Sequence, residues 1–134
     1  GLLSLLTSLR AANLDFLVAI APPLDILGML KKRGGTLVRG VRRGIGYQRL
    51  DPQLATQVGR PLVPAHWPQI LPGHRLALHA AVYDRFVPRR SIEELARLWN
   101  ARLTLHQAAH YNLALSTRIL PEVSAEICAF AGVD

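Results

Sequence analysis

Two continuous apolar segments of strand length constrain the fold of this chain most strongly. Residues 16–21 read Phe-Leu-Val-Ala-Ile-Ala and are closed by Pro22 and Pro23, and residues 76–83 read Leu-Ala-Leu-His-Ala-Ala-Val-Tyr. Both segments are too short for a core helix and too apolar for a strand with one face in water. They predict two strands that are buried on both faces, as in a parallel sheet.

A helix and a third strand follow the second apolar segment. Ser91-Ile-Glu-Glu94 matches a capping box, which predicts a helix that begins here. Its core-facing side chains are Ile92, Leu95, Ala96 and Trp99. Residues 101–106 alternate apolar and polar side chains, which indicates a half-buried strand near a sheet edge. Because strand, helix and strand form a parallel crossover, we predict an α/β fold with a partial parallel sheet of about three strands flanked by helices.

Two further helices are predicted at the ends of the chain. A leucine stripe over residues 2–9 indicates an amphipathic helix that runs to about Ala12. Pro121 opens a last helix, and Gly132 marks its end. The predicted apolar face of this last helix comprises Val123, Ile127 and Phe130.

The region between the first two strands has a different composition, with most of the glycines and prolines and no strong periodicity. Short helices are predicted over residues 26–32, 36–43 and 52–58, the last capped by Asp51. We therefore expect a single domain over residues 1–134 that carries an insertion over residues 26–72.

Charge and cysteine content limit the partners and location of the chain. The net charge is +7, and a basic cluster lies between Lys31 and Arg43, which would favour anionic partners. Stacking aromatic residues are absent from this cluster, so we do not expect nucleic-acid binding. The single cysteine, Cys128, excludes an intrachain disulfide and indicates a reducing, cytoplasmic location. No apolar segment is long enough to span a bilayer.

Two titratable residues follow the ends of neighbouring predicted strands. Asp84 comes directly after residues 76–83, and His110 follows residues 101–106. Because functional groups collect beyond the carboxyl ends of parallel strands, we expect these side chains within or near hydrogen-bonding reach. A carboxylate that accepts a hydrogen bond from imidazole fixes its tautomer and stabilises its protonated form, as a general base requires. Asp84 and His110 are therefore the candidate catalytic residues.

The residues around this pair resemble the C-terminal half of an α/β-hydrolase. The similarity rests on Tyr83-Asp84-Arg85-Phe86-Val87-Pro88, on the predicted helix that follows, and on Ala108-Ala109-His110-Tyr111. The resemblance implies that Asp84 is the triad acid, that His110 is the triad base and that residues 26–72 form a mainly helical, lid-like insertion. It also implies hydrolysis of a small-molecule ester or acyl substrate without a cofactor.

The third member of the triad is missing from the sequence. No G-x-S-x-G nucleophile elbow is present, and Ser4, Ser8, Ser91 and Ser116 do not lie in such a turn. Residues 1–6 resemble the helix that leaves the elbow, so the resemblance implies that the serine and the N-terminal half of the fold precede Gly1. The expected function is then the C-terminal part of an esterase-like serine hydrolase, which is inactive by itself.

Several alternatives remain open. Asp25 follows the first strand and is a rival for the triad acid, although a helix cap explains it equally. The alternative function is a non-catalytic binding module that contacts anionic partners through the basic insertion. His79 and His106 lie within strands, where neutral core histidines with backbone partners are expected. No metal site is expected, because only His106 and His110 have a suitable spacing and no third ligand joins them.

Overall fold

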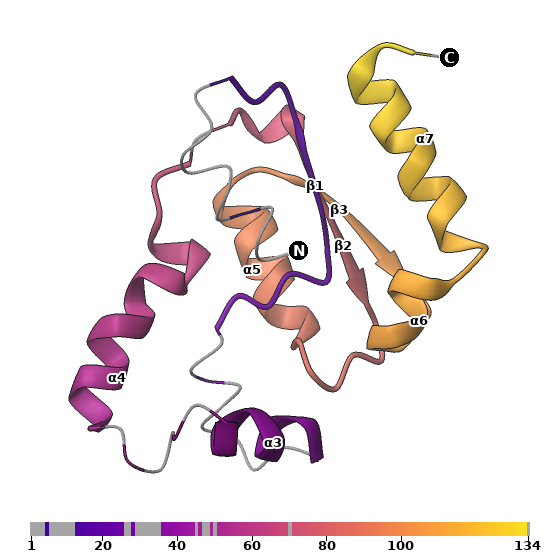
Figure 1. Cartoon of the computed structure of the whole chain (residues 1–134). Coiled ribbons are helices and arrows are strands. Elements are labelled where there is room, and N and C mark those ends of the chain that lie inside the picture. Colours follow the sequence, from indigo (N-terminus) through magenta and orange to yellow (C-terminus); the bar gives the residue numbers. More distant parts are fainter. Residues whose placement is uncertain are drawn as a thin grey trace. The chain divides into compact units, whose positions relative to one another are not determined.

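Figure 1 shows the computed structural model of the chain, which describes residues 5, 13–25, 28, 36–44, 46, 49, 51–69 and 71–133. Contacts between residues divide the chain into two compact units. Unit 1 comprises residues 1–23 and 68–134, and unit 2 comprises residues 24–67. The insertion predicted over residues 26–72 overlaps unit 2.

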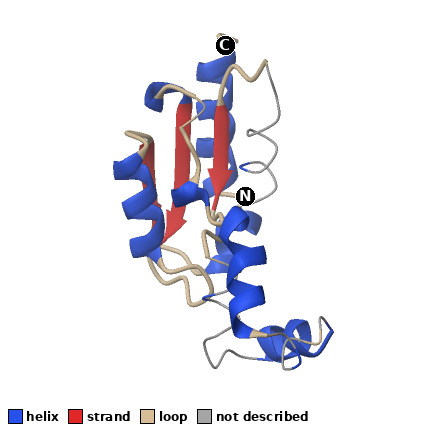
Figure 2. Ribbon diagram, turned by 90° about the vertical axis from the view of Figure 1, so that its left-hand side faces the viewer, coloured by secondary structure: helices blue, strands red, loops and turns tan. Residues whose placement is uncertain are grey.

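Unit 1 is built on a parallel sheet of three strands (Figure 2). The strands are β1 (Leu17–Ile20), β2 (Leu76–Ala81) and β3 (Arg102–His106), and β2 lies between the other two. Every residue of β2 is buried, which confirms a strand covered on both faces. In β3 only His106 is fully buried, as expected of a strand at an edge. The predicted α/β class and its three parallel strands are therefore confirmed.

Helices cover both faces of this sheet (Figures 1 and 2). One face packs against α5 (Arg89–Leu98), and the other carries α6 (His110–Leu115) and α7 (Ile119–Ala131). The side chains of α5 predicted to face the core are all buried: Ile92, Leu95, Ala96 and Trp99. The core beneath α6 and α7 comprises Ala21, Ala81, Ala108, Leu113, Ile119 and Val123. The sheet is thus the middle layer of unit 1.

The start of α5 corrects the sequence prediction. The helix begins at Arg89 with Pro88 at its N-cap position, and no side chain caps it. Ser91 lies inside the helix, while Glu93 and Glu94 pair with the arginines four residues earlier, at 2.7 and 3.2 Å. The predicted capping box is therefore wrong, because these arginines occupy the glutamates and the helix starts directly after the proline.

The last helix also starts earlier than predicted. Ile119 is the first residue of α7, and Pro121 lies in its first turn, where the missing N–H of proline has no helical partner to lose. Gly132 ends α7 in the left-handed conformation, with φ of 67°, as predicted. Val123 of the predicted apolar face is buried, whereas Ile127 is exposed, so that face is only partly covered.

A close backbone approach joins the entrance of β2 to the end of α5. Gly73 begins a 3-10 turn over Gly73–Arg75 that leads into β2. A Cβ atom at Gly73 would overlap the carbonyl oxygens of Trp99 and Asn100, so only glycine fits here. Asn100 itself has φ of 49° and ends the helix, as predicted. Gln69 reinforces the junction, because its Nε2 donates a hydrogen bond to Trp99 O at 2.8 Å.

The described residues of unit 2 include the helices α3 (Thr36–Gly44) and α4 (Pro52–Gly59) and the 3-10 turns Arg60–Leu62 and Pro64–His66. Both helices lie where the sequence predicts them. Asp51 caps α4 as predicted, because its Oδ1 accepts hydrogen bonds from the amides of Gln53 and Leu54, both at 2.8 Å.

Two further predicted helices fall mostly on residues that the structure does not describe. The helices over residues 2–12 and 26–32 lie outside the described residues, apart from Leu5 and Gly28, which are both helical. In the part of the chain that the structure describes, no helix is long and apolar enough to cross a membrane.

Candidate functional site

The turn after β2 holds the carboxylate of Asp84 in a fixed position. Backbone hydrogen bonds of 2.9 and 3.0 Å tie the first two residues of this turn to His106 O and Ala108 O, at the end of β3. Asp84 Oδ1 accepts hydrogen bonds from the amides of Phe86 and Val87, both at 2.8 Å. The side chain of Asp84 is only 1% exposed. Oδ2 remains for a partner from outside the turn.

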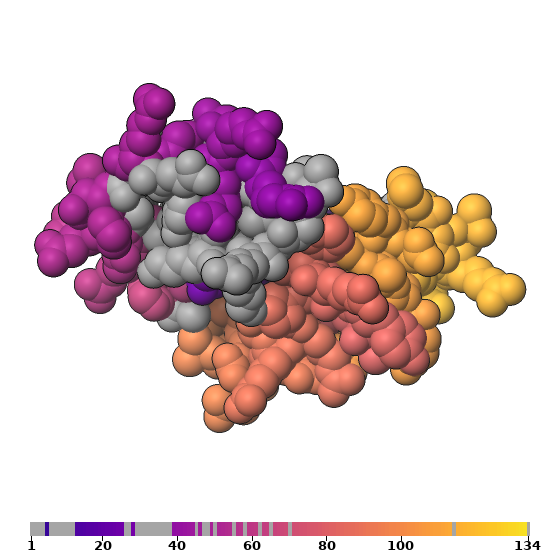
Figure 3. All heavy atoms as spheres, turned by 90° about the horizontal axis from the view of Figure 1, so that it is seen from below, coloured from indigo at the N-terminus to yellow at the C-terminus, as the bar shows by residue number. Residues whose placement is uncertain are grey.

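That partner is His110, the first residue of α6. The distance from His110 Nδ1 to Asp84 Oδ2 is 2.7 Å. Because a carboxylate only accepts, Nδ1 carries a proton and donates it. The His110 side chain is 30% exposed, and among the described residues no hydrogen bond engages its Nε2. The predicted proximity of the two side chains is thus confirmed. Figure 3 shows the molecular surface from below the view of Figure 1, which is the side on which the strands end.

Aromatic rings limit how the His110 ring can turn. The ring centroid of Phe86 lies 5.4 Å from that of His110, and the centroid of Tyr111 lies 5.5 Å away in an edge-on arrangement. Phe86 and Tyr111 also contact each other edge to face, at 5.5 Å between centroids. An aromatic pair of this kind contributes about 0.5–1.5 kcal/mol. The cluster therefore restrains the imidazole in the orientation that the hydrogen bond to Asp84 requires.

The arrangement is that of an oriented general base. A neutral imidazole with Nδ1–H on a carboxylate presents an unprotonated Nε2, which can accept a proton from a hydroxyl nucleophile. The carboxylate then stabilises the imidazolium that forms. Within the described residues no serine bonds to His110: Ser91 is in α5, Ser116 Oγ accepts from Arg118 N, and Ser124 is exposed on α7. Among the described residues, the pair of Asp84 and His110 therefore has no serine partner.

Asp25, the alternative acid, has a different partner. Its Oδ1 accepts a hydrogen bond from the amide of Gly28 at 2.7 Å. This hydrogen bond agrees with the alternative prediction for Asp25, which was a helix cap. The carboxylate that contacts the imidazole of His110 is that of Asp84.

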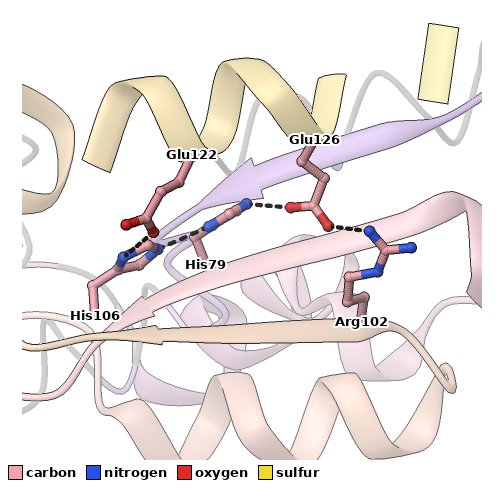
Figure 4. A network of polar contacts seen from close by, with 5 residues as sticks. All are labelled: His79, Arg102, His106, Glu122 and Glu126. Atoms are coloured by element: carbon pink, nitrogen blue, oxygen red, sulfur yellow. Dashed lines mark hydrogen bonds and ion pairs between the residues drawn. The ribbon is translucent and has the colours of Figure 1, made fainter. Parts of the chain in front are cut away.

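The structure also contains a polar network that sequence reasoning missed (Figure 4). His79 and His106 are buried, but side chains are their partners, so the predicted backbone partners are wrong. His79 Nδ1 lies 2.9 Å from His106 Nε2, and His79 Nε2 lies 2.8 Å from Glu126 Oε2 on α7. Burial lowers the pKa of His79, and the Glu126 carboxylate opposes this. The signal that could have found the network is the i, i+4 pair Glu122 and Glu126 on the helix that covers these strands.

Metal binding and similarity to known proteins give no further lead. Over the described ranges, no three histidine, cysteine, aspartate or glutamate residues are grouped so that they could hold a metal ion.

Comparisons with protein-family models, with curated proteins and with solved structures gave no match. The functional assignment therefore depends on the geometry of Asp84 and His110.

Proposed function

We propose that this chain contributes the acid and the histidine of a serine-hydrolase triad, as the C-terminal part of an α/β-hydrolase. The observation that carries the proposal is the 2.7 Å hydrogen bond between His110 Nδ1 and the buried Asp84 Oδ2, beyond the carboxyl ends of neighbouring parallel strands. The substrate class is a small-molecule ester or a similar acyl compound, and no cofactor takes part. The serine comes from a segment outside residues 1–134, and residues 26–72 serve as the lid.

Each described residue then has a defined role in acyl transfer. Nε2 of His110 accepts the proton of the serine hydroxyl as the serine oxygen attacks the acyl carbon, and it later delivers that proton to the leaving alkoxide. Asp84 Oδ2 keeps Nδ1 protonated and stabilises the imidazolium between these steps. The amides of Phe86 and Val87 hold the carboxylate in place. Water hydrolyses the acyl-enzyme by the same proton route.

A binding module that uses the basic insertion is the alternative function. In the described part of the basic cluster, Arg39 and Arg43 are exposed on α3. An exposed basic helix face is common on protein surfaces and needs no partner. A buried carboxylate that orients a part-exposed imidazole is a more specific arrangement, so it favours the hydrolase.

The test uses a fluorophosphonate, which reacts covalently with an activated serine. Residues 1–134 are produced together with the residues encoded before Gly1, and we expect labelling of a serine outside residues 1–134. His110→Gln should abolish labelling and ester turnover. His74→Gln, at an exposed histidine of the same unit, is the matched control and should change neither.

Asp84→Asn separates catalysis from folding. The asparagine Oδ1 can still accept from the amides of Phe86 and Val87, but its NH2 group faces His110 Nδ1 and selects the wrong tautomer. We expect kcat to fall by about 10⁴-fold while the fold is retained. Labelling that survives both His110→Gln and Asp84→Asn, or retention of the chain on a polyanion column without any labelling, would overturn the proposal. Residues 1–134 alone should hydrolyse a nitrophenyl ester no faster than buffer.

A further inference from the structure

A chain of polar side chains, buried at its centre and exposed at Arg102 and Glu122, links the sheet to α7 (Figure 4). Arg102 Nη1 lies 2.8 Å from Glu126 Oε1, and Glu126 Oε2 lies 2.8 Å from His79 Nε2. His79 Nδ1 contacts His106 Nε2 at 2.9 Å, and His106 Nδ1 lies 3.5 Å from Glu122 Oε2. The chain thus runs from one glutamate of α7, through a histidine on each of two strands, to a second glutamate one turn away.

The proton positions in this chain follow from its one buried carboxylate. Glu126 can only accept, so His79 Nε2, 2.8 Å from Glu126 Oε2, carries a proton; this contact is an ion pair by distance and not an aligned hydrogen bond. A neutral His79 then has a bare Nδ1, which accepts from the Nε2–H of His106. With one proton on each ring, the tautomers of both histidines are therefore fixed.

The fixed tautomers bring two acceptors together at one end of the chain. Nδ1 of a neutral His106 has no proton and faces Glu122 Oε2 at 3.5 Å, so two acceptors oppose each other. One added proton at His106 Nδ1 removes the conflict, because His106 then donates to Glu122 and to His79. Every contact in the chain becomes a donor–acceptor pair.

A second added proton has no place. The last free lone pair belongs to His79 Nδ1, which already accepts from His106 and would then place two N–H groups 2.9 Å apart. His79 is also 1% exposed, and burial disfavours its charged form. The pair of rings therefore holds one extra proton and not two.

The pair borders a surface groove on the His106 side. A groove of about 450 Å³ at the end of β3 is lined by both His106 and Glu122. The charged groups that face the pair are Glu122 and Glu126 from α7, Arg102 from β3 and Arg118, which lines the same groove before α7. From β1 the core receives only the apolar Val18 and Ile20. The groove is the route by which the extra proton enters.

We propose that His79 and His106 form a one-proton switch, in which protonation of His106 Nδ1 engages Glu122 and ties α7 to the sheet. The switch is independent of any catalytic role of His110. When His106 Nδ1 has no proton the link through Glu122 is open, and when it carries one the link is closed. The switch therefore changes how firmly the first turns of α7 are held against β3.

Nuclear magnetic resonance of the ring nitrogens in the full 134-residue chain tests the proton count directly. At high pH both rings should be Nε2–H tautomers. On acidification Nδ1 of His106 should gain a proton while Nδ1 of His79 stays bare. Protonation of both rings together, or of His79 first, would overturn the proposal.

Two glutamate variants test the link to α7. Glu122→Gln should shift proton uptake at His106 Nδ1 to lower pH, and Glu94→Gln should not. Glu94 is the matched control because it is a helical glutamate of nearly equal exposure, 59% against 62% for Glu122, on the opposite side of the sheet. Both positions are on the surface, so both variants should fold.

Hydrogen exchange supplies the conformational readout. After correction for the intrinsic effect of pH, the amides of the first two turns of α7 should exchange more slowly when His106 is protonated. This gain should vanish in Glu122→Gln and in His106→Gln, which keeps an N–H donor for His79 but cannot titrate. Equal protection at both pH values in the wild-type chain, or an unchanged gain in both variants, would refute the switch.

Discussion

Replacing His79 by glutamine should change how the stability of unit 1 depends on pH. His79 is buried, and burial lowers its pKa below the ordinary value of 6.5. At pH values between the lowered pKa and 6.5, the unfolded chain therefore binds a proton at the His79 ring and the folded chain does not. Glutamine does not titrate, yet its side-chain amide offers a donor for Glu126 and an acceptor for His106.

The sign and size follow from linkage between protonation and folding. The contribution of His79 to the free energy of unfolding is present above pH 6.5. It is lost as the pH falls from 6.5 towards the lowered pKa of the folded His79. The loss is at most about 1.4 kcal/mol for each pH unit in that window, and therefore at most about 1.4 kcal/mol in total between pH 7.5 and pH 5.5. Titrating groups that do not contact His79 contribute to both proteins and cancel in the difference, whereas His106, at 2.9 Å, is coupled to His79.

Urea denaturation of both proteins at pH 7.5, 6.5 and 5.5 measures this difference. With an ordinary urea dependence, 1.4 kcal/mol corresponds to a relative shift of the midpoint of about 0.5–1.4 M. The wild-type midpoint should fall relative to that of His79→Gln as the pH falls. The exposed His74→Gln should run parallel to the wild type. A wild-type-minus-His79→Gln difference that is constant across the pH range would refute the reasoning.

Three further predictions test the packing and helix capping of the fold. Gly73→Ala should destabilise unit 1 by about 1–3 kcal/mol in urea denaturation, because the added methyl group overlaps backbone carbonyls of the α5 end; no change would contradict that close approach. Ile92→Ala, at a fully buried position, should cost about 2–5 kcal/mol by the same assay, whereas the exposed Leu98→Ala should stay within about 0.5 kcal/mol. Asp51→Ala should weaken α4 by about 1 kcal/mol, measured as roughly fivefold faster hydrogen exchange of its amides, and Asp51→Asn should restore most of the protection.

The strands of unit 1 were predictable because local sequence determines them. Residues 16–21 and 76–83 are apolar throughout and bounded by turn residues, and β1 and β2 lie inside those limits. The start of α5 was not predictable in the same way. Ser91 and Glu94 satisfy the capping pattern, but the pattern does not show that Arg90 competes for Glu94 through an i, i+4 ion pair.

The proximity of Asp84 and His110 was predictable for a topological reason. Parallel neighbours bring the ends of their strands to one edge, whatever the exact register. The contact between His79 and His106 depends on register as well. Ala81 of β2 pairs with His106, which places both histidines on the face under α7. A slip of one residue would move His106 to the face under α5, and the sequence pattern does not exclude such a slip.

The two sets of histidines differ in what their ring nitrogens are free to do, and this difference separates a candidate catalyst from a structural group. Both nitrogens of His79 contact other buried side chains, so its ring cannot act on a substrate. His110 commits only Nδ1, to a carboxylate held by two amides, and the part of the ring without a described hydrogen bond is the half that a general base needs. Burial alone would have pointed to His79, because that side chain is almost fully buried and burial lowers its pKa. One free nitrogen beside one fixed nitrogen is the better criterion, and in unit 1 it favours His110 over His79.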